Sequence, residues 1–176
     1  MLKMQAKYLT TDCLSVISMS GFLMIQLNRI LSSLTPNHRA ALQWFAVRRG
    51  IEVDWPAPLS DGTFLVNRAK GIHKPAGWQH ALSIRQALIS PYPDEEPAIV
   101  SNGTWRYRYF QEGNDPLHQD HYFTNRGLMP CLADGVPVGV LRQIKKKPSP
   151  RYQVMGLAKV LSWEHGFFVF EGINDI

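Results

Sequence analysis

Cysteine is scarce in this chain of 176 residues, which carries two of them, Cys13 and Cys131, far apart in the sequence. Neither belongs to a CxxC pair, which argues against a zinc ribbon, and two distant cysteines argue against a disulfide scaffold. This usage is typical of a reducing compartment, so we expect the protein in the cytoplasm.

Long apolar runs and common enzyme motifs are also missing. The uncharged run 13–28 has 16 residues, short of the roughly 20 that a membrane-spanning helix needs, and no A-x-A cleavage site follows it. We therefore expect residues 1–33 to be an N-terminal extension or added helix, and we expect no membrane partner. The chain has no G-x-S-x-G, P-loop or dinucleotide fingerprint, so no isolated hydrolase and no cofactor is predicted.

One histidine-containing segment is the exception to this lack of enzyme signals. His118, Asp120 and His121 lie in "HQDH", and a three-residue histidine spacing can bind a metal if the loop turns like a helix. No third histidine or cysteine ligand is evident, so we expect a solvated loop without metal. A metal-dependent hydrolase built on these residues is the least favoured function.

The residues that are abundant favour one loop-rich domain with a basic surface. Hydrophobic residues make up 45% of the chain, enough for a core, and there are 13 glycines and 12 prolines. The formal net charge is +5 and the sequence pI is 9.4. A balance of this kind is compatible with a nucleic-acid partner, although many basic proteins bind no polyanion.

Local patterns predict an α+β fold. Thr35 and Pro36 begin a helix over 35–49 that Gly50 ends. Helical spacing is also present over 77–89, and a short helix is expected in 125–135. The predicted strands are 64–66, 104–110, 136–144, 152–163 and 167–172, with a hairpin at "EHG" joining the last two. We expect a curled sheet or barrel with flanking helices.

The strand "GTWRYRYF" alternates aromatic residues with arginines. Trp105, Tyr107 and Tyr109 lie on one face, and Arg106 and Arg108 on the other. Flat rings can stack on unpaired bases while cations hold phosphates. The plainer alternative is a strand whose aromatic residues are core and whose arginines are ordinary outer-face residues.

An acidic segment follows a tyrosine in "PYPDEEP", where Asp94, Glu95 and Glu96 come after Tyr92-Pro93. A carboxylate beside an aromatic ring can accept a hydrogen bond from an exocyclic amine such as cytosine N4 while the ring stacks on the base. The alternative is a solvated acidic loop.

Several short motifs occur in an order that resembles the SRA (SET- and RING-associated) domains. In sequence order they are "LTPNHRAALQWFAVRRG" (34–50), "GIHKP" (71–75), "ALSI" (81–84), "PYPDEE" (91–96), "RYRYFQEG" (106–113), "TNRGL" (124–128), "GVPVGVLRQIKKKPSPRYQVMGLAKVLSW" (135–163) and "GFFVFEGI" (166–173). The resemblance is closest to the SRA-like N-terminal modules of modification-dependent restriction endonucleases with a C-terminal HNH nuclease. It assigns 34–176 as an SRA-like modified-DNA-binding domain.

The resemblance implies a fold that flips a modified cytosine, 5-methyl or 5-hydroxymethyl, out of double-stranded DNA into a pocket. By position, Tyr92 and Tyr109 resemble the aromatic pair that sandwiches the base. Asp94 resembles the reader of its amine, with Glu95 as the competing choice. Gly71, Ile72 and His73 resemble the strand end that lines the pocket, where Gly71 lets the backbone approach the base.

The same resemblance assigns DNA contacts and a partner. Arg126 resembles the residue that fills the vacated stack, in a segment that enters the duplex. The residues expected on the DNA are Lys74, Arg106, Arg108, Asn125, Arg126, Lys145, Lys146 and Lys147. No HNH motif is present, so we expect a binding module rather than an enzyme, with cleavage belonging to a fused or separate nuclease. The alternative is a PUA-like module that binds RNA or a modified nucleotide without base flipping.

Overall fold

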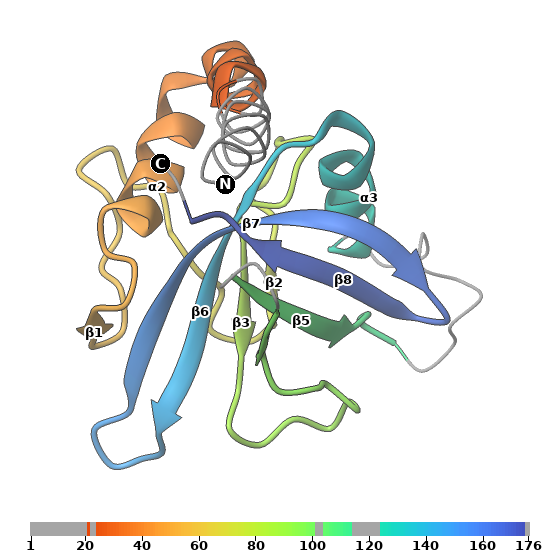
Figure 1. The fold of residues 1–176 in the computed structure, drawn as a ribbon. Coiled ribbons are helices and arrows are strands. Elements are labelled where there is room, and N and C mark those ends of the chain that lie inside the picture. The colour runs from red at the N-terminus through yellow and green to blue at the C-terminus, as the bar shows by residue number, and fades with distance from the viewer. Residues whose placement is uncertain (1–20, 22–23, 101–103, 114–123, 175–176) are drawn as a thin grey trace, which may run out of the picture.

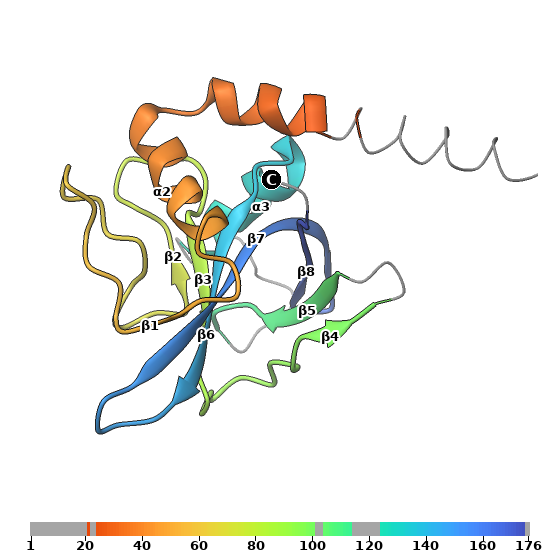
Figure 2. The ribbon, with the colours of Figure 1, turned by 60° about the vertical axis from the view of Figure 1, so that its left-hand side comes forward.

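A strongly bent sheet of eight strands forms the body of the protein (Figures 1 and 2). The computed structural model describes residues 21, 24–100, 104–113 and 124–174. The strands are β1 (Glu52–Val53), β2 (Ile72–His73), β3 (Ser83–Gln86), β4 (Ala98–Ile99), β5 (Trp105–Phe110), β6 (Val138–Lys145), β7 (Arg151–Glu164) and β8 (Phe167–Gly172). Their order is β2-β3-β6-β7-β8-β5-β4, with β1 added on β7. The β3–β6 pair is parallel and the other pairs are antiparallel, so the sheet is mixed.

The long strand β7 is the reason that the sheet curls. Its first half pairs with β6 and its second half with β8, so it belongs to both arms of the sheet. Register shifts between Val140 and Leu141 on β6, and between Val160 and Ser162 on β7, mark bulges that increase local twist. In the described part of the chain no pairing joins the end strands β2 and β4, so the curl stays open.

Two helices cover opposite faces of this sheet (Figure 1). Helix α2 (Pro36–Ala46) begins at Thr35, whose side chain accepts a hydrogen bond from the His38 amide. Its residue Phe45 packs so tightly on Gly139 of β6 that a Cβ there would lie 2.3 Å from the ring. Helix α3 (Asn125–Asp134) ends at Gly135 in the left-handed conformation. A further helix, over residues 24–33, packs Leu31 against the same core as α2.

The core has two parts, one on each face of the sheet. One contains the inward faces of β5, β6 and β8 with Leu128 and Cys131 of α3; the other contains Leu42 and Phe45 of α2 with Leu141 of β6. Alternate residues of β6 therefore contribute to different parts, which explains why the first four residues of this strand are all buried.

The predicted α+β class and curled sheet are confirmed, and this is the fold class that the resemblance to SRA domains implies. The helices at 35–49 and in 125–135, the strand at 104–110 and the three C-terminal strands are all present. The hairpin at "EHG" is a two-residue turn in which His165 and Gly166 both have positive φ.

Two of the expected elements are wrong. Residues 77–89 form no helix, because the Arg85 amide donates to the Gly71 carbonyl and Ser83–Gln86 is recruited between β2 and β6. Residues 64–66 form no strand, although Leu65 and Val66 are buried. Side chains instead of a neighbouring strand pair with the backbone carbonyls of this segment. His73 Nε2 donates to the Phe64 carbonyl, and Ser83 Oγ donates to the Leu65 carbonyl.

Within the described residues, no helix has the length and apolar character that crossing a membrane requires. Most of the uncharged run 13–28 lies outside the described residues. The assignment of 1–33 as a separate extension stays a prediction.

Candidate ligand-binding pocket

A pocket of about 580 Å³ lies between the loop that follows β3, the segment before β2 and the C-terminal end of β5. Its lining includes four residues that the sequence placed in a base-binding pocket: Gly71, Tyr92, Asp94 and Tyr109. They come from three segments far apart in the chain, and the sheet pairing of β2 with β3 and the loop from β3 to β4 bring them together.

Asp94 is held in the pocket wall by the backbone. The Phe110 amide donates to Asp94 Oδ1 at 2.8 Å, so this carboxylate is fixed to the end of β5. Burial raises the pKa of Asp94, and the hydrogen bonds from Phe110 and Ser90 oppose that rise. A carboxylate has about four acceptor positions, which leaves capacity for a ligand amine.

The other two acids of this loop turn away from the pocket. Glu95 pairs with Arg108 on β5, and Glu96 pairs with Arg142 on β6. Glu95 and Glu96 line a neighbouring hollow of about 300 Å³ together with Arg106 and Arg108. Of the two acids that the sequence left as alternatives, Asp94 is therefore the one that lines the larger pocket.

The two candidate stacking rings have different surroundings. Tyr109 is 3% exposed and meets Tyr107 edge-on at 5.8 Å between ring centroids. Tyr92 is half-buried and stacks on Phe110 at 6.1 Å with 24° between ring planes. Both rings line the pocket in contact with protein rings, and their sandwiching of a base stays a prediction.

Gly71 lies directly against Tyr109. A Cβ at Gly71 would lie 1.9 Å from the Tyr109 hydroxyl oxygen, so no side chain fits there while the tyrosine keeps its position. The next two residues do not line the pocket. Ile72 is fully buried in the core, and burial lowers the pKa of His73, whose Nε2 is 2.8 Å from the Phe64 carbonyl.

The predicted DNA-contacting residues lie in three places. Arg106 and Arg108 lie on β5, each paired with a glutamate, Arg106 with Glu171 at 2.8 Å. Lys74 and Arg126 lie close enough for the Arg126 charge to lower the pKa of Lys74, after the larger effect of burial. Lys145, Lys146 and Lys147 are exposed where β6 leads into its hairpin with β7.

Asn125 has a structural role that the sequence did not indicate. It is fully buried, its Oδ1 accepts from the Glu112 amide, and its Nδ2 donates to the Glu112 carbonyl. It therefore ties the start of α3 to the segment after β5. In this arrangement Arg126, which is exposed, is the member of the pair that a nucleic acid could reach.

Sequence reasoning missed three charged residues in the pocket wall: Lys70, Arg85 and Glu112. Glu112 is 7% exposed and accepts from Thr124 Oγ1 and from Lys70 Nζ, the latter at 3.3 Å. Its position in "RYRYFQEG" was a usable signal. Arg85 gave none, because it lies in the segment predicted as a helix.

The proposed metal ligands His118, Asp120 and His121 lie outside the described residues. Among the residues that the structure does describe, no cluster of three or more histidine, cysteine or acidic side chains is arranged to hold a metal.

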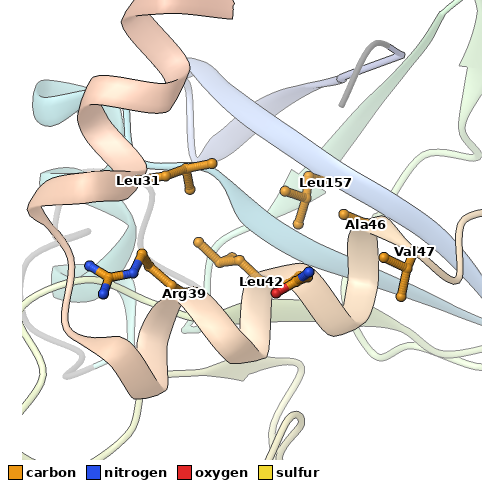
Figure 3. A pocket seen from close by; sticks show the side chains of 7 residues that line it. Leu31, Arg39, Leu42, Ala46, Val47 and Leu157 are labelled. Carbon is orange, nitrogen blue, oxygen red and sulfur yellow. The ribbon is translucent and has the colours of Figure 1, made fainter.

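A second pocket, of about 350 Å³, lies between α2, the helix over 24–33 and β7 (Figure 3). Its walls are mainly Leu31, Leu42, Val47 and Leu157, and Arg39 at its edge donates to the Ser32 and Leu34 carbonyls. It contains none of the predicted site residues and no converging ionisable groups. The pocket beside β5 is therefore the stronger candidate site.

No protein-family model matches the chain, and no curated protein matches it. Among solved structures, the chain is similar to KRYPTONITE in its crystal structure in complex with mCHH DNA, H3(1-15) peptide and SAH. The TM-score is 0.39 and the sequence identity 18%, over 83% of this chain and 39% of that chain. This chain thus spans about two fifths of that chain's length, and a likeness with so low a TM-score establishes no shared function.

Proposed function

We propose that this chain is a DNA-binding module that recognises a modified cytosine by accepting the flipped base in the pocket beside β5. The observation that supports the proposal is the convergence of Gly71, Tyr92, Asp94 and Tyr109 around one pocket. All four belong to the short motifs that resemble those of SRA domains. A volume of about 580 Å³ lies within the range typical of small-ligand sites.

The chemistry of the pocket suits a base that carries an exocyclic amine. Asp94 is oriented by the Phe110 amide and can accept from such an amine. Tyr92 and Tyr109 offer aromatic surface, and stacking contributes about 1–3 kcal/mol per base. Flipping costs a few kcal/mol, so stacking and hydrogen bonding together can offset it.

Cations near the pocket suit the phosphate backbone. Lys74 and Arg126 lie close to each other beside the start of α3, where two cations suit a phosphate of the backbone. Arg108 is held by Glu95 in this structure, and a phosphate would compete with that carboxylate. By the resemblance, such a module would supply the targeting of a cytoplasmic modification-dependent restriction system, with a fused or separate nuclease as the cleaving partner.

The test is fluorescence-polarisation binding at fixed salt to duplexes that differ only in one central cytosine: unmodified, 5-methyl or 5-hydroxymethyl. We expect the protein to prefer one modified duplex by tenfold or more, about 1.4 kcal/mol. Asp94→Asn keeps the shape of the side chain but presents an amide to the base amine, so it should abolish the preference. Glu95→Gln, next in sequence and outside the pocket, is the matched control and should retain it.

Equal, strongly salt-dependent binding to all three duplexes would contradict base recognition and leave only a basic surface. An RNA duplex of the same sequence tests the PUA-like alternative, because contacts to 2′-hydroxyls set the preference for RNA. Tighter binding to RNA than to every DNA duplex would favour that alternative.

A further inference from the structure

A hollow of about 350 Å³ beside α2 takes no part in the proposed base recognition. It lies between α2, the helix over 24–33 and β7, and we call it the α2 groove (Figure 3). Leu42 of α2 and Leu157 of β7, both buried, line it together with the half-buried Leu31. Val47 also lines it, yet this residue is 63% exposed. Aliphatic side chains gathered around one surface hollow are typical of a site that a further molecule covers.

The α2 groove follows two turns of one helix. Its lining residues on α2 and at the C-cap are at positions 39, 42, 43, 46 and 47. This spacing places them on one face of the helix, over about 12 Å at 1.5 Å per residue. A partner helix that presents apolar side chains at i, i+3, i+4 and i+7 matches a groove of that length. A bilayer fits less well, because membrane-bound helices insert a projecting apolar face, whereas these side chains line a hollow.

One cation lies at the edge of the α2 groove and a second lies just past the end of α2. Arg39 donates from Nη1 to two backbone carbonyls at the end of the neighbouring helix, at 3.2 and 2.6 Å. Arg49 packs against Gly156, the residue before Leu157, and its guanidinium donates to the carbonyl oxygen and Oδ1 of Asn174. Neutral oxygens thus hold both guanidinium groups in place without cancelling their charge.

This region contains no acid that could balance its cations. Residues 24–50 carry arginines at 29, 39, 48 and 49 and neither aspartate nor glutamate. Within the described chain, none of these arginines forms an ion pair, whereas every arginine of β5, β6 and β7 is paired with an acid. The complementary occupant is therefore negatively charged as well as apolar. A DNA backbone supplies the charge, but it has no aliphatic side chains to fill the hollow.

We propose that the α2 groove docks an acidic amphipathic helix of a partner protein. Its apolar side chains fill the hollow over Leu42 and Val47, and its carboxylates pair with Arg39 and Arg49. Burial of apolar surface supplies the affinity, and the charges set the orientation and the choice of partner. This inference goes beyond the proposed function, because the α2 groove shares no lining residue with the pocket beside β5.

The probe is a fluorescein-labelled peptide of about 18 residues, long enough to form a helix in water, with leucines at i, i+3, i+4 and i+7 and glutamates beside them. One reference peptide has lysine in place of every glutamate. The other alternates the same leucines and glutamates, which removes the apolar face of a helix. Fluorescence polarisation measures the binding of each peptide to the unchanged protein and to its variants.

The variants separate the apolar contribution from the charge. Val47→Asn makes the exposed wall of the groove polar without changing the charge, and Arg39→Glu reverses the charge at its edge. Arg29→Glu is the matched control, because Arg29 is exposed on the helix over 24–33 and does not line the groove. A thermal melt of each variant checks folding.

We expect the acidic peptide to bind at least tenfold more tightly than either reference peptide. Val47→Asn should weaken its binding at least fivefold, Arg39→Glu at least tenfold, and Arg29→Glu less than threefold. If Arg29→Glu weakens binding as much as Arg39→Glu, net charge alone attracts the peptide and the groove is not its site. Equal binding of the three peptides, or binding of none, would also overturn the proposal.

Other occupants give different results. Vesicles of phosphatidylserine and phosphatidylcholine that bind the unchanged protein but not Val47→Asn, while the acidic peptide does not bind, would identify a membrane surface instead. A dimer in sedimentation that Val47→Asn dissociates would identify a second copy of this chain as the occupant. Asp94→Asn should leave peptide binding unchanged, and Val47→Asn should leave the preference for a modified duplex unchanged. Failure of this proposal is therefore distinguishable from failure of the proposed function.

Discussion

At the scale of single residues, the Tyr109 hydroxyl occupies the space in the pocket wall that a side chain at position 71 would need. The resemblance assigns Gly71 the task of letting the backbone approach a base, but in this structure the atom that approaches it is the tyrosine oxygen. The glycine thus sets how deep the Tyr109 ring can lie, and through it the shape of the pocket.

Gly71→Ala should lower the free energy of unfolding by about 1–3 kcal/mol, because a methyl group would overlap the hydroxyl and force the ring to move. In a Tyr109→Phe background the nearest atom becomes the ring Cζ, 3.1 Å from the added Cβ, so the cost should fall below about 1 kcal/mol. Denaturant unfolding of the four proteins in this cycle measures the coupling. Gly21→Ala, where a Cβ meets nothing within 4 Å, is the control. Equal costs in both backgrounds would mean that the hydroxyl is not the obstacle.

At the scale of elements, the sequence predicted what depends on local signals and missed what depends on pairing partners. Thr35-Pro36 and Gly135 mark the ends of α2 and α3 through local backbone chemistry, and the alternation in "WRYRYF" marks β5. The spacing over 77–89 was misleading because β3 exists only by pairing with β2 and β6. The candidate site followed the same division. Tyr92, Asp94 and Tyr109 belong to recognisable motifs, whereas Arg85 becomes visible only once β3 is placed.

The packing of α2 on the loop before β3 buries His38, and this burial predicts that the stability of the protein depends on pH. His38 of α2 is 4% exposed, its ring meets that of Trp78 at a tilt with 4.5 Å between centroids, and it lies 6.3 Å from His80, which pairs with Asp134 of α3. Burial, and secondly the charge of His80, lower the pKa of His38 to about 4 from 6.5. The unfolded chain therefore binds a proton between these pH values that the folded chain does not, and stability present above pH 6.5 is lost as the pH falls toward 4.

For one such group, the free energy of unfolding should fall by about 2 kcal/mol between pH 7 and pH 5. His38→Phe keeps an aromatic ring against Trp78 and cannot bind a proton, so its stability should change less over this range. Urea unfolding at both pH values measures the difference, and His73, whose pKa burial also lowers, is common to both proteins. An identical fall in both proteins would show that His38 is not the residue responsible.

At the scale of the whole molecule, ion pairs neutralise some of the basic side chains on the surface, whereas the lysines of one hairpin are exposed. Arg106, Arg108 and Arg142 are paired with glutamates, and Arg151 with Asp54. These ion pairs therefore neutralise part of the positive charge of this chain, whose net charge is +5. The exposed lysines at 145–147 form a basic tip where β6 leads into its hairpin with β7 (Figure 1), and none of them lines the pocket beside β5. Affinity and base selectivity are therefore expected to reside in different places.

Replacing Lys145, Lys146 and Lys147 with alanine separates the two properties. Each phosphate that the basic tip no longer neutralises should reduce the slope of log affinity against log salt by about 0.9, so a tip that binds three phosphates would lower it by about 3. Titrating salt against one unmodified and one modified duplex measures the slope and the preference together. The preference should stay within about twofold, because the tip contributes equally to both duplexes. If the slope is unchanged, the tip does not touch the duplex; if the preference falls with the slope, the tip positions the pocket as well, and the two functions are coupled through the β6–β7 hairpin.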